Sequence, residues 1–212
     1  MLMVAIDPSL VSLGLAVLES TGKPHLLQHI KQHNTAANWH ARALQMATAV
    51  QYTLSQNLPL SPFAVLVETP ANWFCERGQD SKNSEAVQKL YFVTGAICAS
   101  LFEIPACRGI WSVDPGQWKG QSPKSVMLTR AQRYCARYDI NLMHAPSDVA
   151  EALLLGVYGL KHQEPTDGSS LRFSEPIIHL FEGCSTARVG NKMDSLYSLC
   201  NFRAFSITNY CG

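Results

Sequence analysis

Short apolar runs and longer stretches with helical spacing follow one another along the first three quarters of the chain. The apolar runs, bounded by turn residues such as Pro, Gly and Ser, predict strands over residues 3–7, 14–18, 25–32, 63–68 and 110–113. Apolar residues that recur every three or four positions predict helices over residues 38–55, 84–101, 123–138 and 148–161. This order predicts an antiparallel meander followed by parallel strands reached through helical crossovers. We therefore expect an α/β fold in which a five-stranded mixed sheet is flanked by helices on both faces.

Residues 163–212 show a different pattern. They are rich in turn residues and keep no helical or alternating period, although one short strand is expected near residues 176–181. A chain of 212 residues suits one domain, or one domain with an appendage. We therefore divide the chain into a domain over residues 1–162 and an irregular C-terminal appendage over residues 163–212.

Composition indicates a reducing compartment. Apolar residues make up 47% of the chain, enough for a sizeable core, yet no apolar run is long enough to cross a bilayer. The N-terminus has no basic segment followed by an apolar one, so we expect no secretory signal. The seven cysteines include no CxxC pair, which argues against a disulfide framework and a zinc ribbon. We expect a cytoplasmic protein with reduced thiols and no membrane partner.

The net charge of +1 does not by itself indicate a nucleic-acid binder. The distribution of charge is more informative, because one acid and six basic residues fall between residues 108 and 137, the basic ones being Arg108, Lys119, Lys124, Arg130, Arg133 and Arg137. A local basic surface can contact phosphate even when the net charge is small. The alternative interpretation is an ordinary solvated helix face.

Four acidic residues lie at the ends of predicted elements. Asp7 and Glu68 each end an apolar run, and Asp148 and Glu151 open the last predicted helix with a spacing that puts both on one face. A carboxylate at the exit of a buried strand is costly unless it is paired, hydrogen-bonded or bound to metal. The four acids therefore predict a cage for two divalent cations of the kind that hydrolyses phosphodiesters. Helix capping alone would explain Asp148, but neither Asp7 nor Glu68.

The order of elements and the places of the acids resemble the RuvC-type Holliday-junction resolvases of the ribonuclease H-like superfamily. The resemblance covers residues 3 to about 161 and rests on four segments: VAIDPS and GLAV (4–9 and 14–17), VLVE (65–68), Lys119 with Lys124 before a helix, and SDVAEAL (147–153). Glu151 stands where the family usually has Asp, and Ser9 and Leu10 stand where it often has Gly. This divergence is typical of a phage or mobile-element version of the family.

The resemblance implies a ribonuclease H-like fold and a metal-dependent endodeoxyribonuclease that resolves Holliday junctions in DNA recombination and repair, inside a bacterial or phage-infected cell. With Mg²⁺ as the cofactor and Mn²⁺ as a substitute, its metal ligands and catalytic acids would be Asp7, Glu68, Asp148 and Glu151. Lys119 and Lys124 resemble the family's basic residues that contact the scissile region. The resemblance also implies a homodimer on branched DNA, since a four-way junction has two strands to cut.

Further residues are predicted to contact DNA. Trp73 and Phe74 lie in a polar loop after the second acid, where RuvC-type enzymes place an aromatic that stacks on unpaired bases. We expect one of this pair to pack into the core. Arg130 and Arg133 lie on one side of a predicted helix and suit the DNA backbone. His144 is either a proton carrier near the acids or a structural residue.

Three alternatives remain open on the sequence. Other ribonuclease H-like nucleases cut RNA–DNA hybrids or structured RNA. Actin-like sugar kinases also begin with an acidic hairpin, but they need a second Gly-containing hairpin, and the sequence has none that matches. A non-catalytic junction-binding protein with a degenerate site would share the fold, but the four acids are intact.

Overall fold

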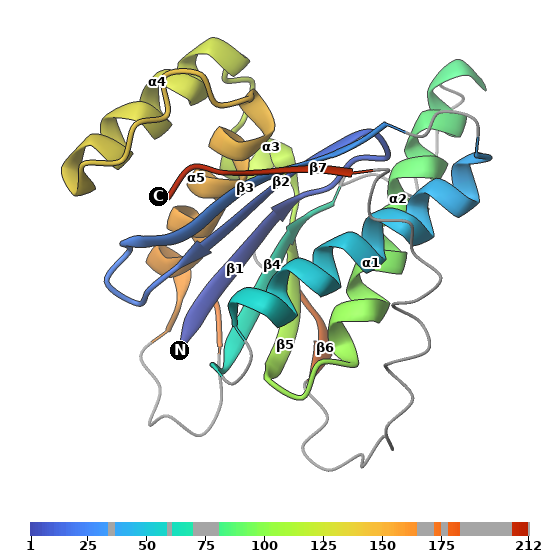
Figure 1. Cartoon of the computed structure of the whole chain (residues 1–212), viewed down its shortest axis with the longest axis horizontal. Helices are drawn as coiled ribbons and strands as arrows, with labels where there is room; N and C mark the ends of the chain where they lie inside the picture. The colour runs from blue at the N-terminus through green and yellow to red at the C-terminus, as the bar shows by residue number, and fades with distance from the viewer. Residues whose placement is uncertain are drawn as a thin grey trace.

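A mixed β-sheet crosses the molecule, with helices packed on both of its faces (Figure 1). The computed structural model describes residues 1–33, 37–58, 61–69, 81–164, 172–174, 178–182 and 205–211, of which 81–84, 178–182 and 205–207 are described by their backbone alone. This arrangement confirms the predicted α/β class. None of the described helices combines the length and the apolar character needed to cross a membrane.

The sheet has seven strands in the order β6-β5-β4-β1-β2-β3-β7. Their bounds are β1 (Leu2–Asp7), β2 (Ser12–Leu18), β3 (Pro24–Gln32), β4 (Phe63–Glu68), β5 (Cys107–Val113), β6 (Ile178–Glu182) and β7 (Phe205–Asn209). The predicted antiparallel meander is β1-β2-β3, and β4 and β5 follow parallel to β1. The prediction of five strands is wrong, because β6 and β7 from the C-terminal segment pair antiparallel with β5 and β3 at the two edges. Such short edge strands are defined by their partners more than by a hydrophobic period of their own.

The helices are α1 (Trp39–Asn57), α2 (Ser81–Phe102), α3 (Pro115–Trp118), α4 (Lys124–Cys135), the 3-10 turn η1 (Ala136–Tyr138) and α5 (Ser147–His162). The predicted helix over residues 123–138 is α-helical only as far as Cys135 and then tightens into η1. α3 is too short to show a hydrophobic period. Its start is fixed by Asp114, whose carboxylate accepts a hydrogen bond from the backbone N–H of Gly116 at 2.7 Å.

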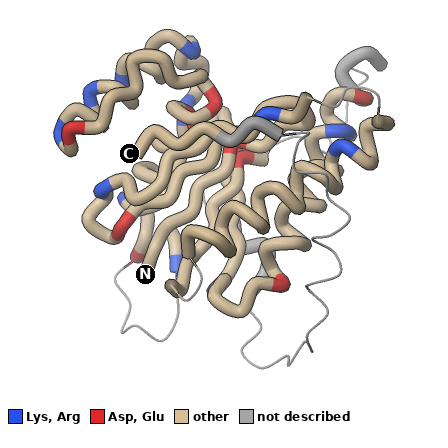
Figure 2. The backbone as a smooth tube through the Cα atoms, viewed as in Figure 1, with Lys and Arg blue, Asp and Glu red and all other residues tan. Residues whose placement is uncertain are grey.

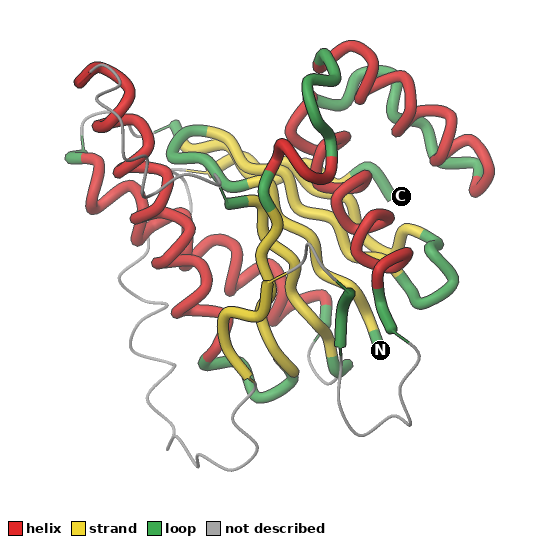
Figure 3. The backbone as a smooth tube through the Cα atoms, turned by 180° about the vertical axis from the view of Figure 1, so that it is seen from behind, coloured by secondary structure: helices red, strands yellow, loops and turns green. Residues whose placement is uncertain are grey.

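Alternation along the strands divides the core between the two faces of the sheet. In β1, Ile6 belongs to the cluster beneath α1 and α2, whereas Met3 and Ala5 belong to the cluster beneath α5. Figure 3 shows the opposite side of the molecule, with α1 and α2 together on one face and α5 on the other. β4 alternates in the same way. Asp7 and Glu68, the last residues of β1 and β4, therefore continue the rows that face α5.

α5 lies very close to the sheet at Gly14 on β2. A Cβ atom at Gly14 would lie 1.9 Å from the carbonyl oxygen of Asp148 and 2.8 Å from the backbone nitrogen of Val149. Gly14 also pairs with Asp7 in the ladder between β1 and β2. The missing side chain at this position lets the first turn of α5 lie directly on the sheet beside Asp7.

Candidate active site

Two parallel strands in the middle of the sheet end in acids and bring them close together. β1 and β4 are neighbours, and their register pairs Ile6 with Val67, the residues just before Asp7 and Glu68. Since successive side chains point to opposite faces, both acids turn toward α5. The two carboxylates therefore lie on the same face of adjacent strands.

The first turns of α5 bring the other two acids to the same place. Asp148 and Glu151 are three residues apart and lie on one side of the helix. On β2, the Ser12 hydroxyl donates a hydrogen bond to Asp148 Oδ2 at 2.5 Å, which fixes the helix start against the sheet. The Glu151 side chain is only 4% exposed, against 18% for Asp148. Glu151 is therefore a buried acid that needs a positive partner.

Two lysines connect three of the four acids, Glu68, Asp148 and Glu151. Lys119, directly after α3, places its Nζ 3.0 Å from Glu68 Oε1 and 2.8 Å from Glu68 Oε2, and the same nitrogen contacts Glu151. Lys124, the first residue of α4, has its Nζ 3.9 Å from Asp148 Oδ1 and 3.9 Å from Glu151 Oε1. The Lys119 side chain is 17% exposed and that of Lys124 is 72% exposed. Lys119 is thus an internal counter-charge, whereas Lys124 remains open to a ligand.

The charges of this group act strongly on one another. Burial, followed by the nearby carboxylates of Glu68 and Glu151, raises the pKa of Asp7 well above its usual value; Lys119 opposes this rise and Asp148 adds to it. Burial also acts to lower the pKa of Lys119, but its hydrogen bonds and ion pairs with Glu151 and Glu68 outweigh that effect and raise it. Negative charge is therefore in excess around Asp7, where a cation would be favoured.

The carboxylate oxygens of these acids are suitable ligands for a hard divalent cation. Mg²⁺ prefers carboxylate oxygens, and four carboxylates act on one another here. Glu151 Oε1 is a buried atom with no hydrogen-bond partner among the described residues. Within those residues, no three His, Cys, Asp or Glu side chains are already grouped as a metal site. The Lys119 ammonium lies between Glu68 and Glu151 and forms an ion pair with each of them.

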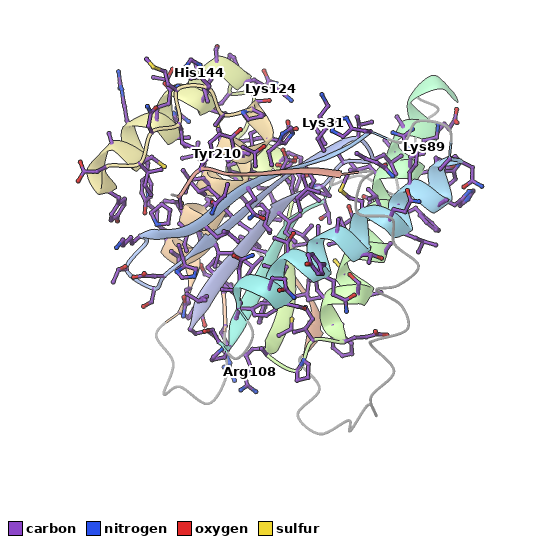
Figure 4. All side chains as sticks on the ribbon, viewed as in Figure 1. Lys31, Lys89, Arg108, Lys124, His144 and Tyr210 are labelled. Carbon is purple, nitrogen blue, oxygen red and sulfur yellow. The ribbon has the colours of Figure 1, made fainter. Side chains whose placement is uncertain are left out.

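The predicted DNA-contacting arginines lie on the surface of α4. Arg130 and Arg133 are both exposed, and Figure 2 shows several basic residues spread along the arm that α4 forms. Lys124 begins this helix, and the exposed His144 lies near it (Figure 4). Arg108 lies near the start of β5, at the opposite end of the strands, so the six basic residues between 108 and 137 do not form one surface.

Trp73 and Phe74, the predicted base-stacking residues, fall in the stretch 70–80, outside the described residues. This stretch connects the strand that ends at Glu68 with α2. Their contact with DNA therefore stays a prediction.

Three further side chains contact or approach the acids. Trp118 donates its indole N–H to Glu68 Oε2 at 2.8 Å, and Ser12 binds Asp148 as described above. His29 on β3 has its Nε2 4.0 Å from Asp148 Oδ2, and burial lowers its pKa. None of these three residues was predicted from the sequence, although strand alternation could have identified Ser12 and His29. Trp118 could have been identified because it directly precedes Lys119, a predicted site residue.

The fold is similar to that of RuvC from Thermus thermophilus. The structure of T. thermophilus RuvC in complex with a Holliday junction substrate aligns with a TM-score of 0.54 and 20% sequence identity, over 75% of this chain and 92% of that chain. A second Thermus thermophilus RuvC structure aligns with a TM-score of 0.53 and 20% identity, over 75% of this chain and 93% of that chain. No protein-family model matches the sequence, and no curated protein does. The comparison confirms the predicted RuvC-like fold.

Proposed function

We propose that this chain is a metal-dependent endodeoxyribonuclease that resolves four-way DNA junctions in recombination and repair. The observation that carries the proposal is the convergence of four carboxylates from β1, β4 and α5. The strand register places Asp7 beside Glu68, and the lysine contacts join Glu68, Glu151 and Asp148. The fold supports the same assignment, since the similar RuvC was solved with a Holliday junction substrate.

The metal ligands in this proposal are the four converging acids, with Mg²⁺ as the cofactor and Mn²⁺ as a substitute: Asp7, Glu68, Asp148 and Glu151. Cations bound by such carboxylates supply an activated water and stabilise the leaving oxygen of a phosphodiester. The chain itself contributes preorganised negative charge, because the strand ends and the first turns of α5 fix the acids before any ligand arrives. Gly14 is what allows these elements to meet.

The two lysines have different tasks in this proposal. Lys124 is largely exposed and lies 3.9 Å from Asp148, so its ammonium can bind a substrate phosphate next to the acids. Lys119 compensates the charges of Glu68 and Glu151 in the free protein. Its position beside the acids also suits it to neutralise negative charge that develops on the phosphate during cleavage.

DNA binding extends beyond the acids. Arg130 and Arg133 on α4 contact the phosphate backbone, which fixes the orientation of the DNA without reading its sequence. Trp73 or Phe74 stacks on unpaired bases of the junction. We assign this activity to residues 1–162, with residues 163–212 as an appendage that also supplies β6 and β7, and we place the protein in the cytoplasm. A homodimer offers two acidic sites for the two strands that resolution must cut.

The proposal is tested on three substrates of related sequence. The full-length chain is incubated with Mg²⁺ and a four-way junction, a linear duplex or an RNA–DNA hybrid. We expect paired nicks in the junction alone, with activity lost in EDTA and restored by Mn²⁺. Cleavage of the hybrid instead would assign the chain to the nucleases that act on RNA. Junction binding without cleavage in either metal would indicate a non-catalytic junction-binding protein.

A matched pair of variants links cleavage to the acidic site. Asp7→Asn keeps the shape of the side chain but removes its charge, so cleavage should be abolished while junction binding persists. Asp139→Asn makes the same chemical change at an exposed residue after η1, where a φ of 59° is compatible with Asn. It should cleave as the wild type does. Normal cleavage by Asp7→Asn would show that the acids are misassigned.

A further inference from the structure

We propose that Trp118 is a positioning residue that holds the Glu68 carboxylate for metal binding through its indole N–H. This inference rests on the proposed function, because it assumes that Glu68 is a metal ligand. The hydrogen bond from Nε1 to Glu68 Oε2, at 2.8 Å, is the observation that carries it. An indole nitrogen is a donor only, so the carboxylate oxygen must be the acceptor.

Glu68 receives donors from two consecutive residues. Trp118 binds Oε2, while the Lys119 ammonium lies 2.8 Å from Oε2 and 3.0 Å from Oε1. The two donors differ in charge. The ammonium cancels the negative charge of the carboxylate and so competes with a metal ion. The neutral indole fixes the orientation of the carboxylate and leaves its charge available, which is what a partner behind a metal ligand must do.

The indole is itself held in place from several sides. α3 begins at the Asp114 cap, and the backbone N–H of Trp118 donates to the Asp114 carbonyl at 3.3 Å. The indole ring faces Tyr158 of α5, with 6.4 Å between ring centroids, and the Lys119 ammonium lies 5.2 Å from the ring centre. Trp118 is half-buried. Its N–H is thus fixed by α3 on one side and by α5, the helix that carries two of the acids, on the other.

The consequence is a preference for one orientation of Glu68. Without the indole, the carboxylate at the end of β4 would keep only Lys119 as a described donor and would rotate more freely. Partners of this kind typically change metal affinity or activity by about 10- to 100-fold when removed. We expect an effect near the lower end, about 10-fold, because the indole is neutral.

Two variants separate the hydrogen bond from the packing of the ring. Trp118→Phe keeps an aromatic ring but has no N–H. Replacing Trp118 with 3-benzothienylalanine keeps the shape of the indole and exchanges the N–H for sulfur. In both, we expect the Kd for Mg²⁺ to rise about 10-fold and kcat at limiting Mg²⁺ to fall, while KM for the junction and kcat at saturating Mg²⁺ stay near wild type. A purely structural role would instead lower stability and leave the Mg²⁺ dependence unchanged.

A spectroscopic readout tests the hydrogen bond without relying on activity. The chain has four tryptophans, and the indole ¹⁵N–¹H signal that disappears in Trp118→Phe identifies Trp118. This signal should lie downfield in the wild type and move upfield in Glu68→Ala. It should stay in place in Asp139→Asn.

The outcomes distinguish the positioning role of Trp118 from the proposed nuclease function. An unchanged Kd for Mg²⁺ in the benzothienylalanine protein, or a Trp118 signal that ignores Glu68→Ala, would overturn the positioning role while junction cleavage by the wild type still stood. A wild-type protein that binds no Mg²⁺ would overturn the proposed function and this role together. A weaker Mg²⁺ affinity together with a shifted indole signal supports it.

Discussion

The contact between α5 and β2 leads to a quantitative prediction for Gly14→Ala. An added Cβ would lie 1.9 Å from the Asp148 carbonyl oxygen, whereas ordinary van der Waals contact begins at 3.4 Å. The first turn of α5 must therefore retreat by about 1.5 Å, because the obstacle is backbone and not a flexible side chain. Overpacking of this kind costs about 1–3 kcal/mol of stability. Asp148 and Glu151 would move away from Asp7 with the helix.

Catalysis should suffer as well as stability. A misplacement of about 1 Å at reacting groups can cost about 10²-fold in rate. We therefore expect Gly14→Ala to remain folded, to lose about 1–3 kcal/mol in urea denaturation, and to cleave junctions about 10²-fold more slowly, with weaker Mg²⁺ binding.

Gly156→Ala is the matched control on the same helix. Residue 156 lies in the middle of α5, away from the acids. The added Cβ would lie 2.2 Å from the end of the Leu18 side chain. It should lose stability but keep its Mg²⁺ affinity. If Gly14→Ala cleaved at the wild-type rate with full stability, the placement of α5 against β2 would be incorrect.

Three further predictions concern charge. Burial and neighbouring acids raise the pKa of Asp7. Above about pH 4, the folded metal-free protein therefore binds more protons than the unfolded chain. Its free energy of unfolding should fall as the pH rises from about 4 to the raised pKa of Asp7. Asp7→Asn should abolish this fall in urea titrations with EDTA, and an identical slope in both proteins would contradict the electrostatic argument. Lys119→Met leaves two glutamates without their bridge and should destabilise the metal-free protein by about 3 kcal/mol, a loss that Mg²⁺ should reduce; equal midpoints in EDTA would refute the bridge. Replacing Arg130 and Arg133 with Gln should make the plot of log K for DNA binding against log salt shallower, reducing the magnitude of its negative slope by about 1.8 in anisotropy measurements. An unchanged slope would exclude both arginines from the DNA contact.

Much of the fold follows from local patterns. The β1-β2-β3 meander, the parallel strands β4 and β5 and the long helices were all predicted, because buried strands and amphipathic helices show periods of their own. β4 ends at Glu68, as predicted. β7 was missed because an edge strand of five residues depends on its partner β3, which lies far away in sequence. α3 was missed because a four-residue helix has no period to detect.

Of the candidate site, the sequence predicted the acids and the lysines but none of their other contacts. The ends of apolar runs identified Asp7 and Glu68, since charge at such positions is costly without a partner. The bridge that Lys119 makes between two glutamates depends on the exact placement of α3, and so does the indole contact of Trp118. Neither follows from spacing. Sequence indicates which groups are costly to bury, while the tertiary structure decides which partner satisfies each of them.

The proposed function requires that the carboxylates at the ends of β1 and β4 and at the start of α5 together bind divalent cations. Anomalous diffraction from crystals grown with Mn²⁺, recorded at the manganese absorption edge, tests this directly. We predict an anomalous peak in contact with the Asp7 carboxylate and with carboxylates of α5, with the Lys119 ammonium displaced from at least one glutamate. Manganese bound elsewhere, with no peak within reach of Asp7, would show that these carboxylates do not form the metal site.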